Sequence, residues 1–421
     1  MAGLQKDPVI IVGGGVIGAC CAYFLAHGGV RVLLLEEHEI ASGCSFGNLG
    51  LLAASHCTPL ASPGVISKAL LWMFSRKSPF SIHWRADPQL AAWLWQFVRA
   101  SRLAGAFAAT AALLQLVFAS MSVFETLSCL SDLGFGLERR GVLELFVTSS
   151  GFARAKERAQ SLSDAGLNLE MLDARAAKAA EPLATPNVKG GLLYHDDHHL
   201  LPADFVHTIA SLAKCAGAEV REHAGVIDFI TTGDRITGVA TKELFSPASA
   251  VILAAGSASQ KLARLLNLRL PVQPARGYSF TAPSHGHSIF RPIMLSESKT
   301  LLTPIGTNLR LGGVLELTEM NSPIDPKRAR ALIQSLPQYL SSEISFEGIE
   351  PWSGDRPCSP DGFPIVGWSQ RWLNLLYATG HGMLGLTLGP LTGQIVTDLV
   401  MGNKPAQDMT RLCPSRFGGY L

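Results

Sequence analysis

The sequence predicts an α/β fold in which a Rossmann-type nucleotide-binding domain is interleaved with an α+β domain built on an antiparallel sheet. The first observation is the stretch 9–36, VIIVGGGVIGACCAYFLAHGGVRVLLLE, which reads as strand, glycine turn, helix and second strand. The second is SAVILAAG at 249–256, typical of a buried strand that returns the chain to a parallel sheet. The third is the alternating pattern over 271–317, which favours antiparallel strands.

The glycine turn gives each of its glycines a mechanical role. Gly13 permits the sharp turn, Gly15 lets the backbone approach a pyrophosphate, and Gly18 lets the helix pack closely on the sheet. The unpaired N–H groups at the start of the helix favour an anion. We therefore expect the phosphates of a dinucleotide beside Gly13, Gly15, Val16, Ile17 and Gly18.

Glu36 ends the second strand of this unit. At that place a carboxylate accepts hydrogen bonds from the two hydroxyls of an adenosine ribose, and it repels a 2′-phosphate. The acid therefore favours an unphosphorylated ribose and argues against NADP.

Composition sets the broad class. A chain of 421 residues predicts two domains, and a net charge of +2 with scattered Lys and Arg argues against a nucleic-acid surface. The eight cysteines have irregular spacings, which favours reduced thiols in a cytosolic protein.

The apolar N-terminus contains the glycine turn, so we interpret it as part of the folded domain rather than as a signal peptide. A membrane-spanning helix is not expected, because no run of eighteen uninterrupted apolar residues occurs.

Two further segments leave alternatives open. The segment 68–82, KALLWMFSRKSPFSI, places apolar residues beside Arg76 and Lys77, and either a membrane-surface patch or a core helix explains it. The segment 195–199, HDDHH, has the residue types of a metal site, but neighbouring side chains diverge and no partner cluster is evident. We therefore predict no metal there and an exposed polar turn before a helix at 202–216.

The expected domains exchange the chain several times. The nucleotide-binding domain is assigned residues 1–80, 201–268 and 350–421, and the second domain residues 81–200 and 269–349.

Three stretches outside the first unit carry chemistry. The segment 41–50 is rich in small and polar residues, and Ser45 and Asn48 supply hydrogen-bonding groups to a loop beside the ligand. The segment 352–367, WSGDRPCSPDGFPIVG, sets Arg356 in a glycine- and proline-rich bend. The segment 375–398 reads as strand, turn and helix, and Gly380-His381-Gly382 directs a helix N-terminus at an electron-rich group.

These motifs together resemble the FAD-dependent D-amino acid oxidase and dehydrogenase superfamily along essentially the whole chain. The family pattern TSFANAG is similar to residues 44–50, RPxTPDGxPIVG to residues 356–367, and TGHGTLGWT to residues 379–387. The sequence is most similar to bacterial D-amino acid dehydrogenases. The resemblance implies a GR2-like flavoprotein fold, in which the nucleotide-binding domain binds FAD and the second domain binds the substrate.

The resemblance also implies how FAD is held. The pyrophosphate would lie at residues 13–18 and the ribose at Glu36, with the backbone of Val226 at the adenine and the turn 380–385 at the pyrimidine end of the flavin. Some relatives attach FAD covalently through a histidine in the first loop (residues 41–50); Gly47 stands at that place, so non-covalent FAD is expected. The remaining implied cofactor-binding residues are Ser45, Asn48, Gly50, Gly256, Gly380, His381, Gly382, Leu384 and Gly385.

The implied reaction is transfer of hydride from the α-carbon of a neutral amine to flavin N5, followed by hydrolysis of the imine. Arg356 resembles the arginine that pairs with the substrate carboxylate, for which a planar fork is well suited. Tyr278 either closes the substrate pocket or is an ordinary sheet aromatic. His381 either donates a hydrogen bond to the flavin or only shapes the turn.

Two departures from the family pattern fall near the expected pocket. Leu386 replaces the usual tryptophan, and His56 stands where the dehydrogenases typically carry a tyrosine. The combination resembles D-hydroxyproline dehydrogenases, so a cyclic D-imino acid is the first candidate substrate beside a broad range of D-amino acids. His56 either contacts the ring hydroxyl or is a buried structural histidine.

The electron acceptor is expected to be a quinone or another carrier. The enzyme is expected in the cytoplasm, with peripheral contact to the inner face of the membrane and an oligomer or partner subunit as open possibilities. Two alternatives remain for the function. One is a glycine- or sarcosine-type amine oxidase that uses oxygen, and the other is a non-catalytic FAD-bearing subunit of a heteromeric dehydrogenase.

Overall fold

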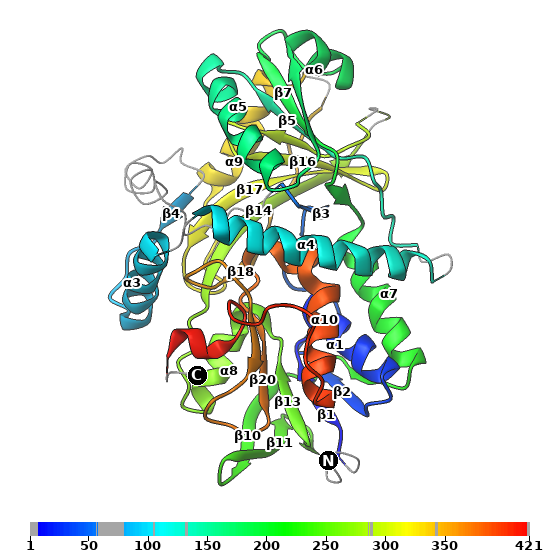
Figure 1. Ribbon diagram of the computed structural model, residues 1–421, viewed down its shortest axis with the longest axis vertical. Helices are drawn as coiled ribbons and strands as arrows, with labels where there is room; N and C mark the ends of the chain where they lie inside the picture. Colours follow the sequence, from blue (N-terminus) through cyan, green and yellow to red (C-terminus); the bar gives the residue numbers. More distant parts are fainter. Residues whose placement is uncertain are drawn as a thin grey trace.

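Two sheets, one in each half of the molecule, organise the fold (Figure 1). The computed structural model describes residues 7–55, 57, 80–103, 106–130, 134–284, 286, 289–341 and 344–418. Both chain ends lie in the half that contains β1 (Figure 1).

The first sheet has six strands in the order β19-β20-β13-β1-β2-β9. Five strands are parallel and β19 is antiparallel to β20. Its central strands are buried on both faces, which is why they read as continuous apolar runs. The bounds are β1 Val9–Val12, β2 Val32–Leu35, β9 Glu219–Arg221, β13 Ala250–Leu253, β19 Ile365–Trp368 and β20 Leu375–Thr379.

Alternating residues of this sheet face two different layers. Val9 and Ile11 pack in one core with helices α1 (Val16–His27), α7 (Pro202–Cys215) and α10 (Gly385–Met401). Ile10 and Val12 pack in another core with α8 (Ser259–Leu265) and a three-stranded antiparallel sheet. That small sheet consists of β10 Val226–Thr232, β11 Arg235–Thr241 and β12 Phe245–Pro247.

The second sheet has the order β18-β14-β17-β16-β15-β5-β7-β6, with β4 paired to β17. Its pairs are antiparallel apart from β15 with β5 and β17 with β4. The bounds are β4 Phe80–Ile82, β5 Val142–Phe146, β6 Leu169–Asp173, β7 Gly190–Tyr194, β14 Gln273–Pro283, β15 Ile293–Leu295, β16 Thr300–Ile305, β17 Asn308–Leu317 and β18 Trp352–Cys358.

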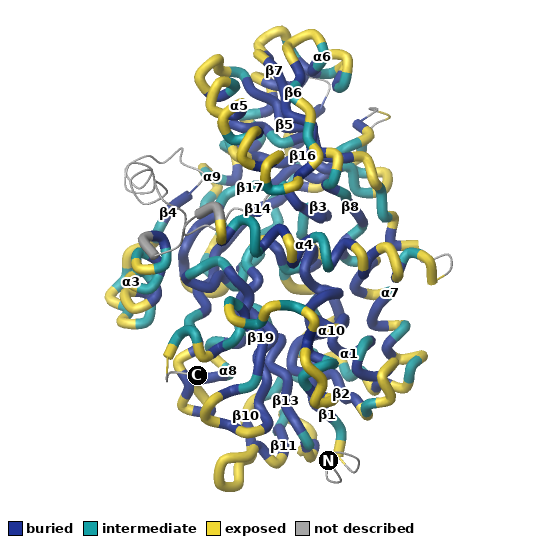
Figure 2. Tube along the Cα trace, in the orientation of Figure 1, coloured by how far each residue is buried: buried dark blue, intermediate teal, exposed yellow. Residues whose placement is uncertain are grey.

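The helices of the second half are α5 Ser149–Asp164, α6 Ala174–Ala180 and α9 Pro326–Ser335, with the 3₁₀ turn η2 at Leu336–Gln338. Buried residues run through both sheets, and exposed ones gather at the outer ends (Figure 2). The remaining 3₁₀ turns are η1 Gly256–Ala258, η3 Gly382–Leu384 and η4 Pro414–Phe417.

Three connections tie the two halves together. After β4 the chain forms two helices, α3 (Pro88–Leu103) and α4 (Ala106–Ser128), and α4 runs across the middle of the molecule (Figure 1). Ser120 of α4 donates a 2.6 Å hydrogen bond to the Thr387 carbonyl of α10. A two-stranded sheet pairs β3 (Leu51–Leu52) with β8 (His198–His199).

Sheet membership differs from the expected domain boundaries at residues 350–358 and, by a single residue, at Phe80, where β4 begins in the second sheet. Residues 350–358 were assigned to the nucleotide-binding domain, yet β18 pairs with β14 in the second sheet. The chain therefore passes from the second sheet into the first after β18 rather than before it. The remaining division stays a prediction.

The expected exposed turn at 195–199 is wrong in part. Asp197 is fully buried and His199 is 3% exposed, and β8 directly after Asp197 pairs with β3. Asp197 accepts hydrogen bonds from the amide and the hydroxyl of Ser55, and burial raises its pKa to about 7. Among the described residues, no group of three metal-ligating side chains occurs.

Two helical segments of the described chain are long and apolar enough to cross a membrane, namely residues 108–128 and 382–401. Half of the first and about two thirds of the second (50% and 67%) are buried within the protein, as in the core helices of globular folds. Each segment is therefore only weak evidence for a membrane span. Of the apolar segment 68–82, only β4 lies within the described residues.

Candidate active site

A cavity of about 1920 Å³ lies where the carboxyl ends of β1, β13 and β20 meet the second sheet. In an open parallel sheet this edge is the usual place for a ligand. The cavity runs from Glu36 and Val226 past Arg356 to Glu144 on β5. Pockets for a single small molecule measure roughly 300–1,000 Å³, so this one has room for a dinucleotide and a second ligand.

At two positions of the first glycine turn no residue other than glycine fits. Gly13 has φ +112°, and a Cβ there would lie 2.6 Å from the Ala254 carbonyl oxygen. A Cβ on Gly18 would lie 1.8 Å from the Gly13 carbonyl oxygen. Helix α1 therefore packs directly against the turn, and this contact aligns its N-terminus with the cavity. These contacts agree with the turn expected at Gly13 and with the close helix packing expected at Gly18.

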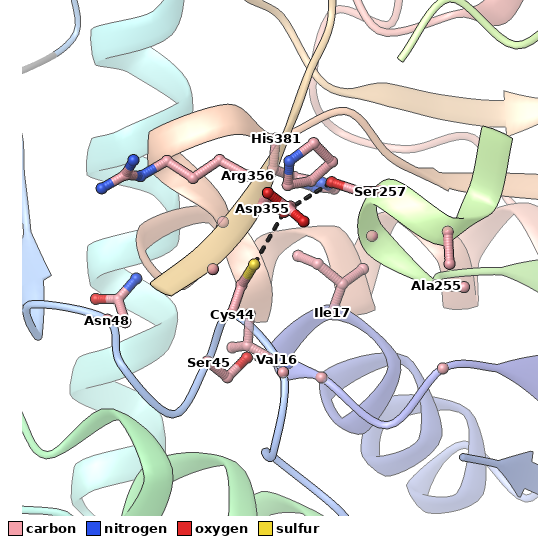
Figure 3. A pocket seen from close by; sticks show the side chains of 18 of the residues that line it. Val16, Ile17, Cys44, Ser45, Asn48, Ala255, Ser257, Asp355, Arg356 and His381 are labelled. Atoms are coloured by element: carbon pink, nitrogen blue, oxygen red, sulfur yellow. Dashed lines mark hydrogen bonds between the residues drawn. The ribbon is translucent and has the colours of Figure 1, made fainter. Parts of the chain in front are cut away.

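Ser45 completes the N-terminus of α1. The capping position is Gly15, which has no side chain to offer, and the Val16 amide instead donates a 3.1 Å hydrogen bond to Ser45 Oγ. The next amides of the helix have no intrahelical acceptor. With the hydroxyl hydrogen of Ser45, they form a cradle of donors for an anion (Figure 3).

Glu36 borders the cavity beyond this cradle. Its carboxylate accepts from the Gly14 amide at 2.6 Å and from the His38 amide at 2.9 Å. These two bonds fix the orientation of the carboxylate, and the remaining lone pairs can accept ribose hydroxyls.

The first loop is held between the two sheets by Arg310 of β17. One Nη atom of Arg310 donates to the carbonyl oxygens of Phe46 at 2.8 Å and Asn48 at 2.7 Å, and Nε donates to Thr281 at 2.9 Å. Sequence reasoning missed Arg310, since nothing in its local pattern separates it from a surface arginine. The only signal is a charged residue between two apolar neighbours, Leu309 and Leu311.

Gly47 lies against the indole of Trp352. A Cβ at Gly47 would fall 2.0 Å from an atom of that ring. No side chain fits at this position while Trp352 stays in place. This contact gives a steric reason for glycine where some relatives carry a histidine.

His381 begins the turn that faces the cavity from β20. Its Nε2 lies 2.9 Å from Thr392 Oγ1, whose own hydrogen goes to the Leu388 carbonyl. Nε2 therefore carries the proton, and Nδ1 is a buried acceptor without a partner among the described residues. Burial lowers the pKa of His381 to about 3, so the ring is neutral at physiological pH. Gly380 and Gly382 have φ +77° and +55°, which explains the glycines on either side.

Arg356 enters the cavity from β18, and in Figure 3 its side chain extends away from Asp355 and His381. The guanidinium covers Gly277, where a Cβ would lie 2.0 Å from Nη1. Nη1 donates to the Val314 carbonyl at 3.2 Å, and Val314 has the unusual φ of +67°. Within the described residues no carboxylate pairs with Arg356. Burial lowers its pKa, which increases the benefit of an anionic ligand.

Tyr278 is on the opposite face of the sheet from Arg356. Tyr278 is paired with Ser353 and Ala275 with Arg356, so alternation turns the ring away from the Arg356 side. Its hydroxyl donates to Glu316 at 2.5 Å and accepts from the Asp325 amide at 3.1 Å. Tyr278 borders the cavity but is only 1% exposed. This placement supports the sheet-aromatic alternative over a catalytic residue that closes the substrate pocket.

The same buried face contains a bidentate ion pair. Arg276 donates to both carboxylate oxygens of Asp355, at 2.8 and 2.6 Å. The Asp355 carbonyl oxygen accepts from Ser257 and Cys44, which links β18 to the nucleotide-binding half (Figure 3). The strand that carries Arg356, β18, is therefore held by β14 on one side and by the nucleotide-binding half on the other.

Most expected cofactor-binding residues border one continuous cavity. They are Gly13, Gly15, Val16, Ile17, Glu36, Ser45, Asn48, Val226, Gly256, His381, Gly382, Leu384 and Gly385. Gly18, Gly50 and Gly380 do not border it; a Cβ on Gly50, for example, would lie 2.3 Å from the Leu200 carbonyl oxygen. These three shape the backbone rather than line the site. His56 lies outside the described residues.

Comparisons with known proteins agree with this geometry. The family model described as FAD dependent oxidoreductase (DAO) matches residues 8–399. The chain belongs to the DAO family of FAD-dependent oxidoreductases. It is 31% identical to the D-amino acid dehydrogenase of Paramagnetospirillum magneticum over 98% of this chain and 99% of that protein. It is 30% identical to the D-amino acid dehydrogenase of Agrobacterium fabrum over 97% and 99%.

Solved structures show the same fold. Glycine oxidase from Bacillus cereus superposes with a TM-score of 0.75 at 23% identity, covering 95% of this chain and 96% of that one. L-proline dehydrogenase from P. horikoshii gives a TM-score of 0.72 at 18% identity, covering 98% of both chains. At these identities the likeness extends to the fold alone.

The residues present fit the cofactor of this family. The donor cradle at α1 is suited to a pyrophosphate, and Glu36 to a ribose. A Cβ on Gly256 would meet nothing within 4 Å, so this position leaves open space along the cavity. The turn at Gly382 directs amides at the far end, where a helix N-terminus favours negative charge.

We predict that Arg310→Met weakens FAD binding. Loss of the guanidinium frees two loop carbonyls, and charge-assisted hydrogen bonds contribute roughly 1.5–3 kcal/mol, so the Kd for FAD should rise roughly 10- to 100-fold. Titration of the apoprotein with FAD measures this. Arg140→Met removes an exposed arginine paired with Glu138 and should leave the Kd unchanged. An unchanged Kd in Arg310→Met would contradict the clamp.

We also predict a pH signature for His381. The unfolded histidine takes up a proton near its ordinary pKa of 6.5, but the folded one does so only near 3. Folding stability therefore falls as pH drops from about 6.5 towards 3, by up to about 1.4 kcal/mol per pH unit. His381→Gln should flatten the curve in urea melts at saturating FAD, whereas His207→Gln, an exposed histidine, should not. Equal slopes in all three proteins would count against a neutral His381.

Proposed function

We propose that this flavoenzyme is a dehydrogenase that oxidises the CH–NH bond of a D-amino or D-imino acid and passes the electrons to a quinone or another carrier. The observation that carries the proposal is Arg356, a partly buried guanidinium at the cavity with no carboxylate partner in the described chain. The relatives named D-amino acid dehydrogenase, which match over nearly their whole length, support the reaction class.

The chain's own residues bind and orient the substrate. Arg356 presents N–H groups to the α-carboxylate, and the Val314 carbonyl fixes the guanidinium by occupying one of them. When bound, FAD would accept the hydride from the α-carbon. The protein then needs to supply orientation rather than a strong base, provided the amine arrives neutral.

Non-covalent attachment of FAD belongs to the same proposal. Residue 47 is a glycine, because Trp352 fills the space next to it. No side chain is therefore available there for a covalent bond. Acid precipitation of the protein should therefore leave the flavin in the supernatant.

The function is tested by anaerobic bleaching of the flavin absorbance. The panel pairs D- and L-isomers of proline, 4-hydroxyproline and alanine, and adds sarcosine. Bleaching by D-isomers alone supports the proposal, and a hydroxyproline preference would select the cyclic imino acids. Reoxidation by air at the rate of turnover would instead indicate an oxidase. No bleaching with FAD bound would favour a non-catalytic subunit or an amine outside this panel.

We predict that Arg356→Leu raises KM and lowers kcat while FAD stays bound. Loss of a bidentate carboxylate pair should reduce kcat/KM by roughly 100-fold or more. Arg356→Lys keeps the charge without the fork and should recover only part of the loss. Wild-type kinetics in Arg356→Leu would remove Arg356 from carboxylate binding.

A further inference from the structure

A row of neighbouring residues crosses the second sheet on the face that looks towards the first loop. The row begins at Ser279, whose hydroxyl donates to the Gly47 carbonyl, and register partners in adjacent strands share a face. Through successive strands it continues as Gly312, Leu301, Met294 and Glu144. These four residues all border the cavity that contains Arg356.

Glu144, at the far end of the row, is the centre of a polar cluster. Its carboxylate accepts from Ser296 at 2.7 Å, from the Tyr194 hydroxyl at 2.9 Å and from Nη2 of Arg158, which is 3.0 Å from the same hydroxyl. Glu144 is 4% exposed. Burial opposes its ionisation, but Arg158 and Lys299 outweigh burial and lower the pKa of Glu144.

The hydrogen-bonding groups of this cluster that have no partner in the described chain are N–H donors. Ser296 and Tyr194 give their hydroxyl hydrogens to Glu144, and the carboxylate already accepts three hydrogen bonds. Only Nη2 of Arg158 has partners in the described chain, so Nη1 and Nε keep three N–H groups. The Arg158 side chain is 40% exposed and borders the cavity.

We propose that Arg158, supported by Glu144 and Tyr194, forms a distal subsite for the substrate side chain, so that the enzyme favours D-amino acids ending in a hydrogen-bond acceptor, a carboxylate above all. The inference rests on the proposed function, because Arg356 must hold the α-carboxylate at the other end of the cavity. A planar guanidinium is suited to a second carboxylate for the same reason.

The spacing of the strands favours a long substrate. The Arg356 guanidinium reaches Val314 of β17, and Glu144 is on β5, three strands further along the sheet. With strands about 4.8 Å apart, the two positions are separated by roughly 14 Å between backbones, which the arginine side chains shorten. A methyl side chain does not bridge this gap, whereas an extended side chain of several atoms does.

The test compares matched substrates in the holoenzyme with an artificial electron acceptor. D-2-Aminoadipate and D-glutamate carry a distal carboxylate, and D-norleucine is an apolar counterpart of similar length. In the wild type, kcat/KM should be higher for the acidic substrates. Arg158→Met should reduce the ratio of D-2-aminoadipate to D-norleucine by roughly 10- to 100-fold.

A binding measurement separates the subsite from turnover. Glutarate, a dicarboxylate that cannot be oxidised at a CH–NH bond, should perturb the flavin spectrum of the wild type and not that of Arg158→Met. The matched control is Arg154→Met, which removes an exposed arginine one turn earlier on α5 and should change neither readout. If Arg158→Met fails to fold, Glu144→Gln/Arg158→Met removes the uncompensated buried charge and serves in its place.

The outcomes are distinct. An equal loss for all substrates in Arg158→Met would mean that the cluster only braces the sheet, and it would overturn the subsite. An unchanged substrate ratio would overturn it as well. If no D-amino acid bleaches the flavin but glutarate binds through Arg158, the proposed function fails while the anion subsite stands. If D-amino acids do not bleach the flavin and glutarate does not bind, the subsite is overturned.

Discussion

The clamp between Arg310 and the first loop is the interaction on which the site depends. A cation buried in the second sheet donates to two carbonyl oxygens of a loop that belongs to the first half. The loop in turn caps α1 through Ser45, accommodates Trp352 at Gly47 and packs Gly50 on the Leu200 backbone. Because a loop rich in small residues has little apolar area to bury, these polar contacts hold its position.

Side chains alternate between the two faces of each strand, so the second sheet places residues of the cavity on one face and buried supporting residues on the other. One face of β18 presents Arg356 to the cavity, and the other buries the Asp355–Arg276 pair. Burying two charges costs solvation, so the pair contributes more to the geometry of β14 and β18 than to net stability. Val314 adds a strained backbone, φ +67° on a β-branched residue, at the carbonyl that holds Arg356. Strain at this place is consistent with a guanidinium that is oriented before any ligand arrives.

The electrostatics of the cavity are arranged for anions. Arg356 and Arg310 remain cations although burial lowers the pKa of both, and the N-termini of α1 and η3 point into the same space. His381 is neutral because burial excludes its charged form. The cavity thus combines fixed positive groups with a neutral ring at the turn, as suits a cofactor that gains negative charge on reduction.

The amino-acid sequence by itself determined the nucleotide-binding unit, the FAD family and the role expected of Gly13, Gly18 and Glu36. Those features depend on residues close together in the chain, where a turn, a helix start and a strand end leave a pattern of fixed spacing. The tertiary structure alone decided the clamp by Arg310, the face on which Tyr278 lies, the burial of Asp197 and the Arg158–Glu144 cluster. Each of these depends on contacts between segments more than a dozen residues apart, and the face of Tyr278 depends on strand register. A one-residue shift in register would reverse the face of every side chain, and no local pattern records that choice.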